Sequence, residues 1–293
     1  MGKILLAGPE MNLEESFRQA APGDVIHLKA GIYRQKLLLD RPGVTLEGEG
    51  ADKTILIYDD YAKKIDGQGR EYNTFRTYTL AVCADHVTIR NLAIVNDAMN
   101  PKEKGQEVAL SVLGDDFLME DCRLASTQDT LFAGPLPPDL IERYDGFLRD
   151  ELRAPGPFRQ QYRRCLIEGT VDFIFGCADA IFEACEIRSV FDGRHGGFVA
   201  APAHSLEQER GLHFRACRFT CTREVEAESI YLARPWRDFG LCRFEDCVYG
   251  PHIRQEGFDK WNDTNRDQTA RFYEAPLRPG RVPWARTWNT NEE

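Results

Sequence analysis

The chain has 293 residues, of which 42% are hydrophobic and 29% charged, so we expect a packed globular protein rather than a disordered one. Its net charge of −10 at pH 7 argues against nucleic-acid binding, because contacts to phosphates need a basic surface. No apolar run approaches the roughly 18 to 20 residues of a membrane span, and the apolar stretch before Gly8 is too short for a signal-peptide core. We therefore expect a cytoplasmic protein that does not bind a membrane.

Cysteines and histidines show no metal-binding or disulfide pattern. The nine cysteines are odd in number and form no CxxC pair, which favours thiols in a reducing compartment. The six histidines form no HExxH motif, and Cys83 with His86 is a lone CxxH pair. The sequence also lacks a Gly-rich phosphate loop and a GxSxG nucleophile motif. We expect no cofactor and no metal.

The predicted elements begin with one short helix and continue as strands. Residues 12–21 are predicted to form an amphipathic helix, with Asn12 as N-cap and Glu15 at the third helical position. The later segments are short, rich in β-branched and aromatic residues, and bounded by Gly, Asp or Asn, which is typical of strands. These segments are residues 44–50, 86–96, 117–126, 159–169, 180–190, 212–220 and 241–250.

Five of these segments share one pattern: an apolar residue, two variable residues, Cys, one variable residue and a second apolar residue. A sixth copy has Leu92 in the Cys position. The repetition favours a parallel β-helix in which each copy belongs to one coil and the cysteines stack inside. An antiparallel sandwich is the alternative, although Asp-Gly turns do not recur between the copies. The cysteines are Cys122, Cys165, Cys185, Cys217 and Cys247.

Two acids have the same phase in this repeat. Asp129 and Asp172 each lie seven residues after a repeat cysteine, so stacked coils would place them on adjacent strands, about 4.8 Å apart. Two neighbouring carboxylates repel, and such a pair can provide one ionised nucleophile and one protonated acid. A polar ladder on the outer surface is the alternative interpretation, because Asp192 and Glu224 share the same phase.

Four longer blocks occur in order: GQEVALSV (105–112), TQDTLFAG (127–134), IEGTVDFIFGCADAIF (167–182) and YLARPWRDF (231–239). With KAGIYRQKLLL and VTLEGEG near the N-terminus, they resemble the pectin methylesterases, and the likeness extends to about Trp284. The resemblance, to a bacterial-type intracellular member, implies an all-β, single-stranded right-handed parallel β-helix. We expect one such domain over residues 1–293, with a short N-terminal helix and long loops around a cleft.

The resemblance implies an aspartyl esterase that hydrolyses galacturonate methyl esters and releases methanol. Asp172 would attack the ester carbonyl, while Asp129 would protonate the leaving methoxide and later deprotonate water. Arg234 would keep Asp172 ionised and lower its pKa. The other implied site residues are the oxyanion donors Gln106 and Gln128 and the substrate-binding residues Trp236, Arg234 and Phe175. From the residues alone, the glutamines could be ladder amides, and Trp236 and Phe175 could be core residues.

The chain departs from the family pattern in several places. Residues 134–158 form an insertion, which we expect to be a loop beside the cleft, and residues from about 255 to 293 are expected to form a C-terminal cap. Ala233 replaces the usual small residue before the essential Arg. Glu107 replaces a usual Ala, and we expect its side chain to point outward.

The expected substrate is methylesterified oligogalacturonide or pectin, in pectin catabolism or cell-wall modification, and we expect the protein to act as a monomer. A cytoplasmic location favours short imported fragments over whole pectin. Three rival functions stay open at this point. A glycoside hydrolase could also use two carboxylates about 5 Å apart. An acyl thioesterase on the same scaffold and a catalytically silent carbohydrate-binding β-helix are the others.

Overall fold

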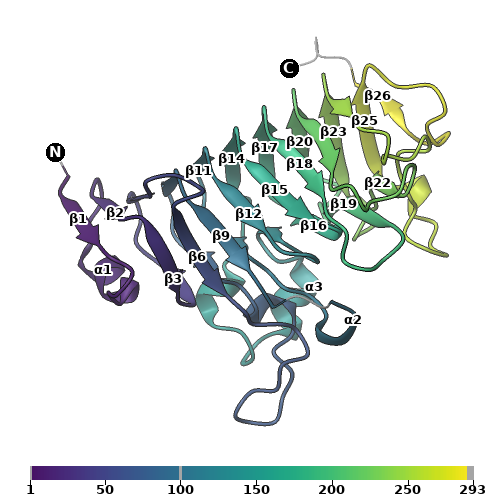
Figure 1. Cartoon of the computed structure of the whole chain (residues 1–293). Helices are drawn as coiled ribbons and strands as arrows, with labels where there is room; N and C mark the ends of the chain where they lie inside the picture. Colours follow the sequence, from purple (N-terminus) through teal and green to yellow (C-terminus); the bar gives the residue numbers. More distant parts are fainter. Residues whose placement is uncertain (1, 99–100, 289–293) are drawn as a thin grey trace.

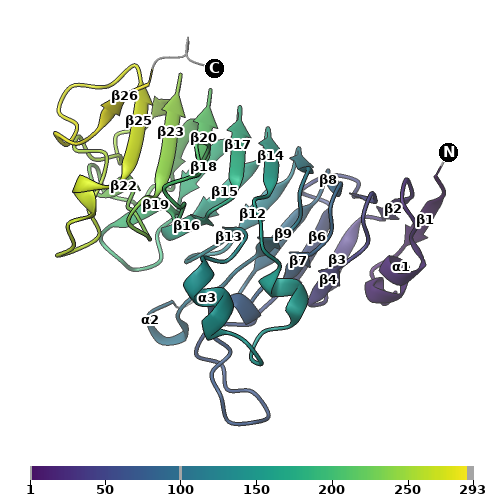
Figure 2. The same ribbon diagram turned by 180° about the vertical axis from the view of Figure 1, so that it is seen from behind.

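Three parallel sheets form the body of the protein. The computed structural model describes residues 2–98 and 101–288, and in this part of the chain 26 strands form sheets of eleven, eight and seven strands. Over most of the chain, consecutive strands enter the first, second and third sheet in turn and then return to the first. Figures 1 and 2 show the coils stacked from the N-terminal to the C-terminal end. The chain is a parallel β-helix, and the antiparallel alternative is wrong.

The strands of each sheet follow one another along the helix axis. The first sheet contains β1 (Ile4–Ala7), β2 (Val25–Leu28), β5 (Thr45–Glu47), β8 (Thr88–Arg90), β11 (Phe117–Glu120), β14 (Arg159–Arg163), β17 (Asp179–Glu183), β20 (Leu212–Arg215), β23 (Leu241–Glu245), β25 (Arg271–Ala275) and β26 (Arg286–Thr287). The second contains β3 (Gly31–Arg34), β6 (Thr54–Tyr58), β9 (Ala93–Asn96), β12 (Arg123–Ala125), β15 (Leu166–Gly169), β18 (Glu186–Ser189), β21 (Arg218–Cys221) and β24 (Val248–Tyr249). The third contains β4 (Leu37–Leu39), β7 (Leu80–Val82), β10 (Leu110–Val112), β13 (Leu131–Ala133), β16 (Val171–Gly176), β19 (Gly197–Pro202) and β22 (Ile230–Ala233).

Helices are few and short among the described residues. The predicted N-terminal helix is confirmed as α1 (Leu13–Gln19), whose N-cap Asn12 accepts a hydrogen bond from the Glu14 amide at 3.0 Å. Its buried Leu13 and Phe17 join the N-terminal end of the core. The remaining helical segments are α2 (Pro101–Lys104), α3 (Pro138–Arg143) and three 3-10 turns at Thr74–Arg76, Asp150–Arg153 and Arg266–Gln268.

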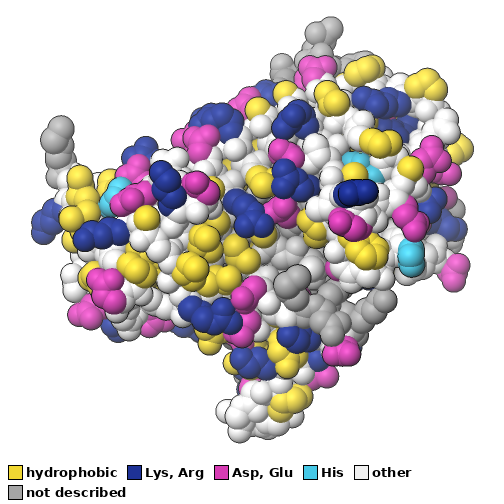
Figure 3. Space-filling view, in the orientation of Figure 1, with side chains coloured by type: hydrophobic (Ala, Val, Ile, Leu, Met, Phe, Trp, Pro, Cys, Tyr) yellow, Lys and Arg dark blue, Asp and Glu magenta, His cyan; other side chains and the backbone are white. Residues whose placement is uncertain are grey.

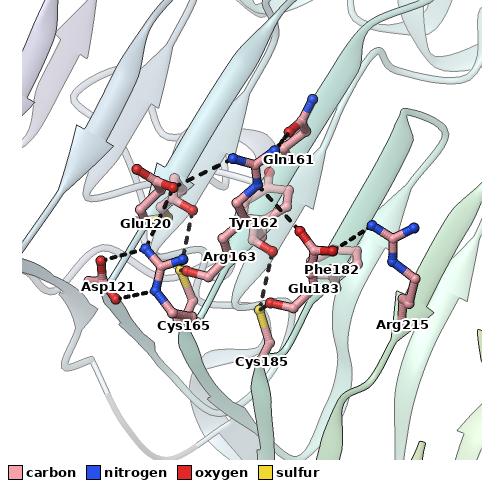
Figure 4. Close-up of polar contacts among 12 residues, drawn as sticks. Glu120, Asp121, Gln161, Tyr162, Arg163, Cys165, Phe182, Glu183, Cys185 and Arg215 are labelled. Carbon is pink, nitrogen blue, oxygen red and sulfur yellow. Dashed lines mark hydrogen bonds and ion pairs between the residues drawn. The ribbon is translucent and has the colours of Figure 1, made fainter. Parts of the chain in front are cut away.

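Four of the five repeat cysteines are buried in the interior, as predicted, and Cys247 is partly buried against it. Each thiol donates a hydrogen bond to a carbonyl one coil back; for example, Cys185 Sγ lies 3.3 Å from Tyr162 O (Figure 4). The apolar residues three positions before each repeat cysteine form a second interior row. In this row Tyr162, Phe182 and Phe214 stack with neighbouring ring centroids 4.7 Å apart. All nine cysteines are free thiols. The positions that recur in the sequence repeat are therefore those whose side chains face inward in successive coils.

The turn between the first and second sheets is the same in six coils and uses a left-handed residue just before the Cys position. Arg164 and Ala184 have φ of 51° and 52°, although neither is Gly or Asn. Their amides continue the ladder by donating to the next coil, as Arg164 N does to Glu183 O at 3.0 Å. The other members are Asn91, Asp121, Ala216 and Asp246.

Charged side chains on the first sheet pair across strands. Arg163 lies between Glu120 and Glu183, and Glu183 also pairs with Arg215 one coil further on (Figure 4). Figure 3 shows positive and negative side chains interspersed over the side of the molecule that faces the viewer in Figure 1. Such cross-strand pairs support coil stacking modestly, by about 0.2 to 1 kcal/mol each.

One long segment packs over the third sheet, and another covers the C-terminal end of the core. Residues 134–158 include α3, which lies beside the third-sheet strand β13 in Figure 2. Their buried Leu136, Leu140 and Leu152 belong to one apolar cluster with Phe132 of that strand. The C-terminal segment adds β25 and β26 and buries Phe258 and Phe272 at the end of the core. No helix in residues 2–98 and 101–288 is long and apolar enough to cross a membrane.

Candidate active site

A cleft of about 370 Å³ lies over the third sheet. Residues before β10 and β13, within β16 and β19 and after β22 line it, so five successive coils contribute. The structure brings all seven sequence-predicted site residues to this cleft: Gln106, Gln128, Asp129, Asp172, Phe175, Arg234 and Trp236.

The position of Asp172 depends on a local irregularity of β16. Pairing with β19 shifts register between Val171 and Ile174, which is the signature of a β-bulge. Asp172 also has a left-handed φ of 50°. As a result Phe173 and Ile174, although consecutive, both belong to the interior core, while Phe175 joins the apolar cluster on the cleft side. This irregularity explains how one acid within an apolar strand reaches the cleft.

Arg234 holds the Asp172 carboxylate in a two-point clamp. Its Nε donates to Oδ1 at 2.8 Å and its Nη2 donates to Oδ2 at 2.6 Å. The two side chains are only 14% and 10% exposed. The Arg234 guanidinium is itself sandwiched between the rings of Phe198 and Trp261, with Cζ 3.8 and 4.1 Å from their centroids. Both charges are thus buried, oriented and neutralised by each other.

Asp129 and Asp172 are register neighbours, as the repeat predicted. The bridge between Gln128 and Val171 and the pairing of Leu131 with Ile174 place the two acids opposite each other on adjacent coils. Asp129 also has a left-handed φ, 63°. Asp192 does not extend this pair, because a connection before β19 displaces it and its side chain instead binds Arg194.

The two acids differ in how strongly they hold a proton. Burial and then the negative charge of Asp172 raise the pKa of Asp129 well above its ordinary value. Burial also raises the pKa of Asp172, but the hydrogen bonds and charge of Arg234 oppose that rise. Arg234 therefore lowers the pKa of Asp172 as expected, although burial outweighs this effect and leaves the pKa raised. The order is nevertheless clear: Asp129 keeps its proton to higher pH than Asp172.

The cleft also contains residues that the sequence did not single out. Phe75 precedes the coil of Gln106, Tyr144 comes from the segment 134–158, and Trp261 comes from the C-terminal segment. Arg143 reaches the rim from α3, and Arg237 pairs with Asp139 at 2.9 Å. Arg237 falls within the block of residues 231–239 without having been assigned a role, and no repeat or motif marked the others, because they lie in connections whose packing is set by tertiary contacts.

Glu107 is buried, so the expectation that it points outward is wrong. The residue is 0% exposed, and its Oε2 accepts a hydrogen bond from Thr127 Oγ1 at 2.8 Å. Its Oε1 is buried without a hydrogen-bond partner among the described residues. Burial raises the pKa of Glu107 above its ordinary value.

Glu107→Gln should make the free energy of unfolding less dependent on pH. A carboxyl with a raised folded-state pKa binds its proton more tightly when folded, so its contribution is present at low pH and is lost as pH rises above the unfolded value of about 4.5. The variant should match the parent near pH 4 and exceed it near pH 7, measured by denaturant unfolding. If the free energy of unfolding of the parent instead rose relative to that of the variant with increasing pH, the prediction would be wrong.

Comparisons with known proteins agree with this geometry. The family model described as Pectinesterase matches residues 12–135 and 148–281. The chain is 30% identical over 275 residues to Pectinesterase 31 of Arabidopsis thaliana, covering 89% of this chain and 77% of that protein. It is 28% identical over 283 residues to Pectinesterase QRT1 of Arabidopsis thaliana, covering 91% of this chain but 66% of that protein, so it spans just under two thirds of QRT1.

A solved structure shows the same fold. A pectin methylesterase crystallised with a hexasaccharide superposes with a TM-score of 0.80 at 23% identity, covering 99% of this chain and 93% of that one. The fold is thus the right-handed parallel β-helix of the pectin methylesterases, as expected from the sequence. The chain belongs to the pectinesterase family. Among the described residues, no group of His, Cys, Asp and Glu could hold a metal ion.

Proposed function

We propose that this protein is a pectin methylesterase that removes methyl esters from galacturonate units of oligogalacturonides. One observation carries the proposal: a buried, clamped Asp172 lies opposite Asp129 in a cleft that also holds Gln106 and Gln128. This set provides a nucleophile, a proton donor and two amide donors for an oxyanion. Family membership supports the same reaction class.

The cleft chemistry fits a sugar ester. Trp236, Trp261 and Tyr144 offer flat rings on which pyranose faces could pack, and Arg143 places a positive charge at the rim. The related protein of known structure carries a bound hexasaccharide. The free, mostly buried thiols fit a reducing compartment, where short imported fragments would be the substrate.

In the first half-reaction, an Asp172 oxygen attacks the C6 carbonyl carbon and forms a tetrahedral oxyanion. The amide N–H groups of Gln106 and Gln128 stabilise that oxygen. The bond from C6 to the methoxy oxygen then breaks, and Asp129 gives its proton to the leaving methoxide, which departs as methanol. The product is a mixed anhydride between Asp172 and galacturonate.

In the second half-reaction, water attacks the anhydride while the Asp129 carboxylate takes one of its protons. Collapse of the second tetrahedral species releases galacturonic acid, which gives its proton to solvent, restores the Asp172 carboxylate and leaves Asp129 protonated for the next cycle. Arg234 stays in contact with Asp172 and returns it to the same orientation. The order of proton affinities supports these roles, because Asp129 is the acid that holds its proton.

The rival functions fit the cleft less well. A retaining glycosidase forms no carbonyl oxyanion. In such an enzyme the two cleft amides and the Arg234 clamp would have no role in the chemistry. An acyl thioesterase would need a wide apolar groove, whereas this cleft is lined by aromatic, amide and charged side chains. A silent binding protein would not need a raised-pKa acid beside a clamped one.

The test is methanol release from highly methylated hexagalacturonate and, in parallel, from polymeric pectin. We expect methanol from both, with a higher kcat/KM for the hexamer. New reducing ends without methanol would overturn the proposal in favour of a glycosidase. Binding without either product would favour a carbohydrate-binding protein, and hydrolysis only of acyl thioesters would favour the third rival.

Asp129→Asn should separate leaving-group protonation from attack. We expect kcat for methyl esters to fall by about 10²- to 10⁴-fold, because methoxide then leaves without a proton. A galacturonate ester of an acidic phenol needs no such proton, so the variant should release one equivalent of phenol quickly and then stall at the anhydride. Mass spectrometry should locate that adduct on Asp172. Equal losses on both esters would count against the role of Asp129.

A further inference from the structure

Arg194 lies behind Gln128, outside the cleft, and donates a hydrogen bond from Nη1 to Gln128 Oε1 at 2.8 Å. It comes from the connection between β18 and β19, a region that no sequence motif marked. Its side chain is 22% exposed. The contact spans 66 residues of sequence, so the coil arrangement creates it rather than local structure.

Asp192 fixes the Arg194 side chain. Arg194 Nε donates to Asp192 Oδ2 at 2.8 Å, Nη2 donates to the same oxygen, and the Arg194 amide donates to Oδ1 at 3.1 Å. The Asp192 side chain is 1% exposed, so its position is set by the surrounding structure. These contacts leave Nη1 of Arg194 to bind Gln128.

The chemistry of this contact determines which way the Gln128 amide faces. The two ends of an amide have nearly the same shape, and either can occupy a given place. A guanidinium has only donors, so it accepts only the oxygen end as its partner. The Nε2–H groups of Gln128 must therefore point away from Arg194, and Gln128 itself lines the cleft.

We propose that Arg194, held by Asp192, is a positioning residue that fixes the Gln128 amide as a hydrogen-bond donor to the oxyanion. The proposal rests on the esterase function proposed above. Without Arg194, the amide can rotate and present its oxygen to the developing negative charge, which would repel rather than stabilise it. The contact thus prepares the oxyanion site before substrate binds.

Arg194→Met should lower kcat for methanol release by about tenfold and leave KM nearly unchanged, because the interaction acts on the transition state. This loss is smaller than the roughly 10²- to 10³-fold expected for Gln128→Ala, which removes the donor itself. Arg194→Lys, which keeps one donor and the charge, should recover most of the rate. Arg223→Met is the matched control, since exposed Arg223 lies in the corresponding connection of the next coil.

The double variant Gln128→Ala, Arg194→Met tests whether Arg194 acts through Gln128 or affects the rate independently of it. In a Gln128→Ala background, Arg194→Met should change kcat by less than about twofold, because the group that it positions is gone. The same tenfold loss in both backgrounds, or no loss beside intact Gln128, would overturn the proposal. Rates are compared at the pH optimum of each variant, since the charge of Arg194 also lowers the pKa values of Asp129 and Asp172.

A second variant covers the case in which Arg194→Met does not fold, and the activity of the parent separates the role of Arg194 from the esterase function. If Arg194→Met does not fold, as judged by thermal unfolding, Asp192→Asn is the second variant, because it weakens the contacts that hold the Arg194 side chain in place. Its rate loss should likewise vanish in the Gln128→Ala background. A loss that persists there would overturn the proposal. No methanol from the parent protein would instead refute the esterase function, whereas an active parent with additive variants would refute only the role of Arg194.

Discussion

Asp172→Asn should reduce methanol release by on the order of 10⁴- to 10⁶-fold, the range seen when a covalent nucleophile is removed. The amide cannot form the anhydride, yet it nearly preserves the shape that the Arg234 clamp encloses. Binding of methylated hexagalacturonate, measured by calorimetry, should therefore persist while turnover disappears. The loss should be in kcat, with little change in the affinity for substrate.

Asp179→Asn is the matched control for that variant. Asp179 starts β17, seven residues after Asp172, and burial also raises its pKa, but it does not line the cleft. It should keep at least half of the parental kcat. If Asp172→Asn retained more than about one part in a hundred of the parental rate, another residue would have to be the nucleophile.

Arg234→Ala should affect both stability and activity. Removing one partner of a buried ion pair leaves Asp172 charged and unpaired, which costs about 3 to 5 kcal/mol of unfolding free energy. The pKa of Asp172 should rise further, because burial is no longer opposed. The stability deficit of the variant should therefore grow as pH rises above the folded-state pKa of Asp172 in the parent, since the parent then ionises Asp172 beside Arg234 while the variant must keep a proton or bury an unpaired charge.

Activity should follow the same shift. Asp172 must be ionised to attack, so the acidic limb of the kcat profile should move to higher pH in Arg234→Ala. Arg234→Lys keeps the charge but loses the two-point contact and the stacking between Phe198 and Trp261, so it should fall between parent and Ala variant. An unchanged acidic limb in Arg234→Ala would show that Asp172 does not titrate in that limb.

The stability loss of Arg234→Ala can be compared with that of Arg237→Ala, which removes another arginine of the same cleft. Arg237 pairs with Asp139, whose side chain is 51% exposed, so water can solvate that carboxylate when the Arg is removed. The stability loss should stay below about 1 kcal/mol. The contrast between the two arginines tests whether burial of the partner, rather than loss of an Arg, causes the effect.

The sequence predicted those features that repeat from coil to coil. The stacked cysteines and the Asp129–Asp172 pair followed from counting residues after each Cys, because parallel pairing keeps the phase constant. That counting failed for Asp192, where the connection before β19 changes the phase. The phase of an acid is therefore informative only while the turns between the coils keep their length.

Other features depend on three-dimensional packing that no short pattern records. The bulge at Asp172 arises from pairing with β19, and the left-handed turn residues Arg164 and Ala184 have side chains that usually avoid this conformation. Trp261 comes close to Arg234 only after the C-terminal segment has packed. Buried Glu107 accepts a hydrogen bond from Thr127 on the next coil, a contact that the coil arrangement creates.

The segment 134–158 joins β13 to β14, and thus the coil of Asp129 to that of Asp172, yet it does not set their spacing. Strand pairing does that, through Leu131 with Ile174 and their neighbours. Doubling the length of such a connection costs only about 0.6 kcal/mol of closure entropy. The chemistry and the selectivity of the cleft can therefore evolve separately: exchanging this one module would change the wall that carries Arg143 and Tyr144 while the reacting carboxylates stay where they are.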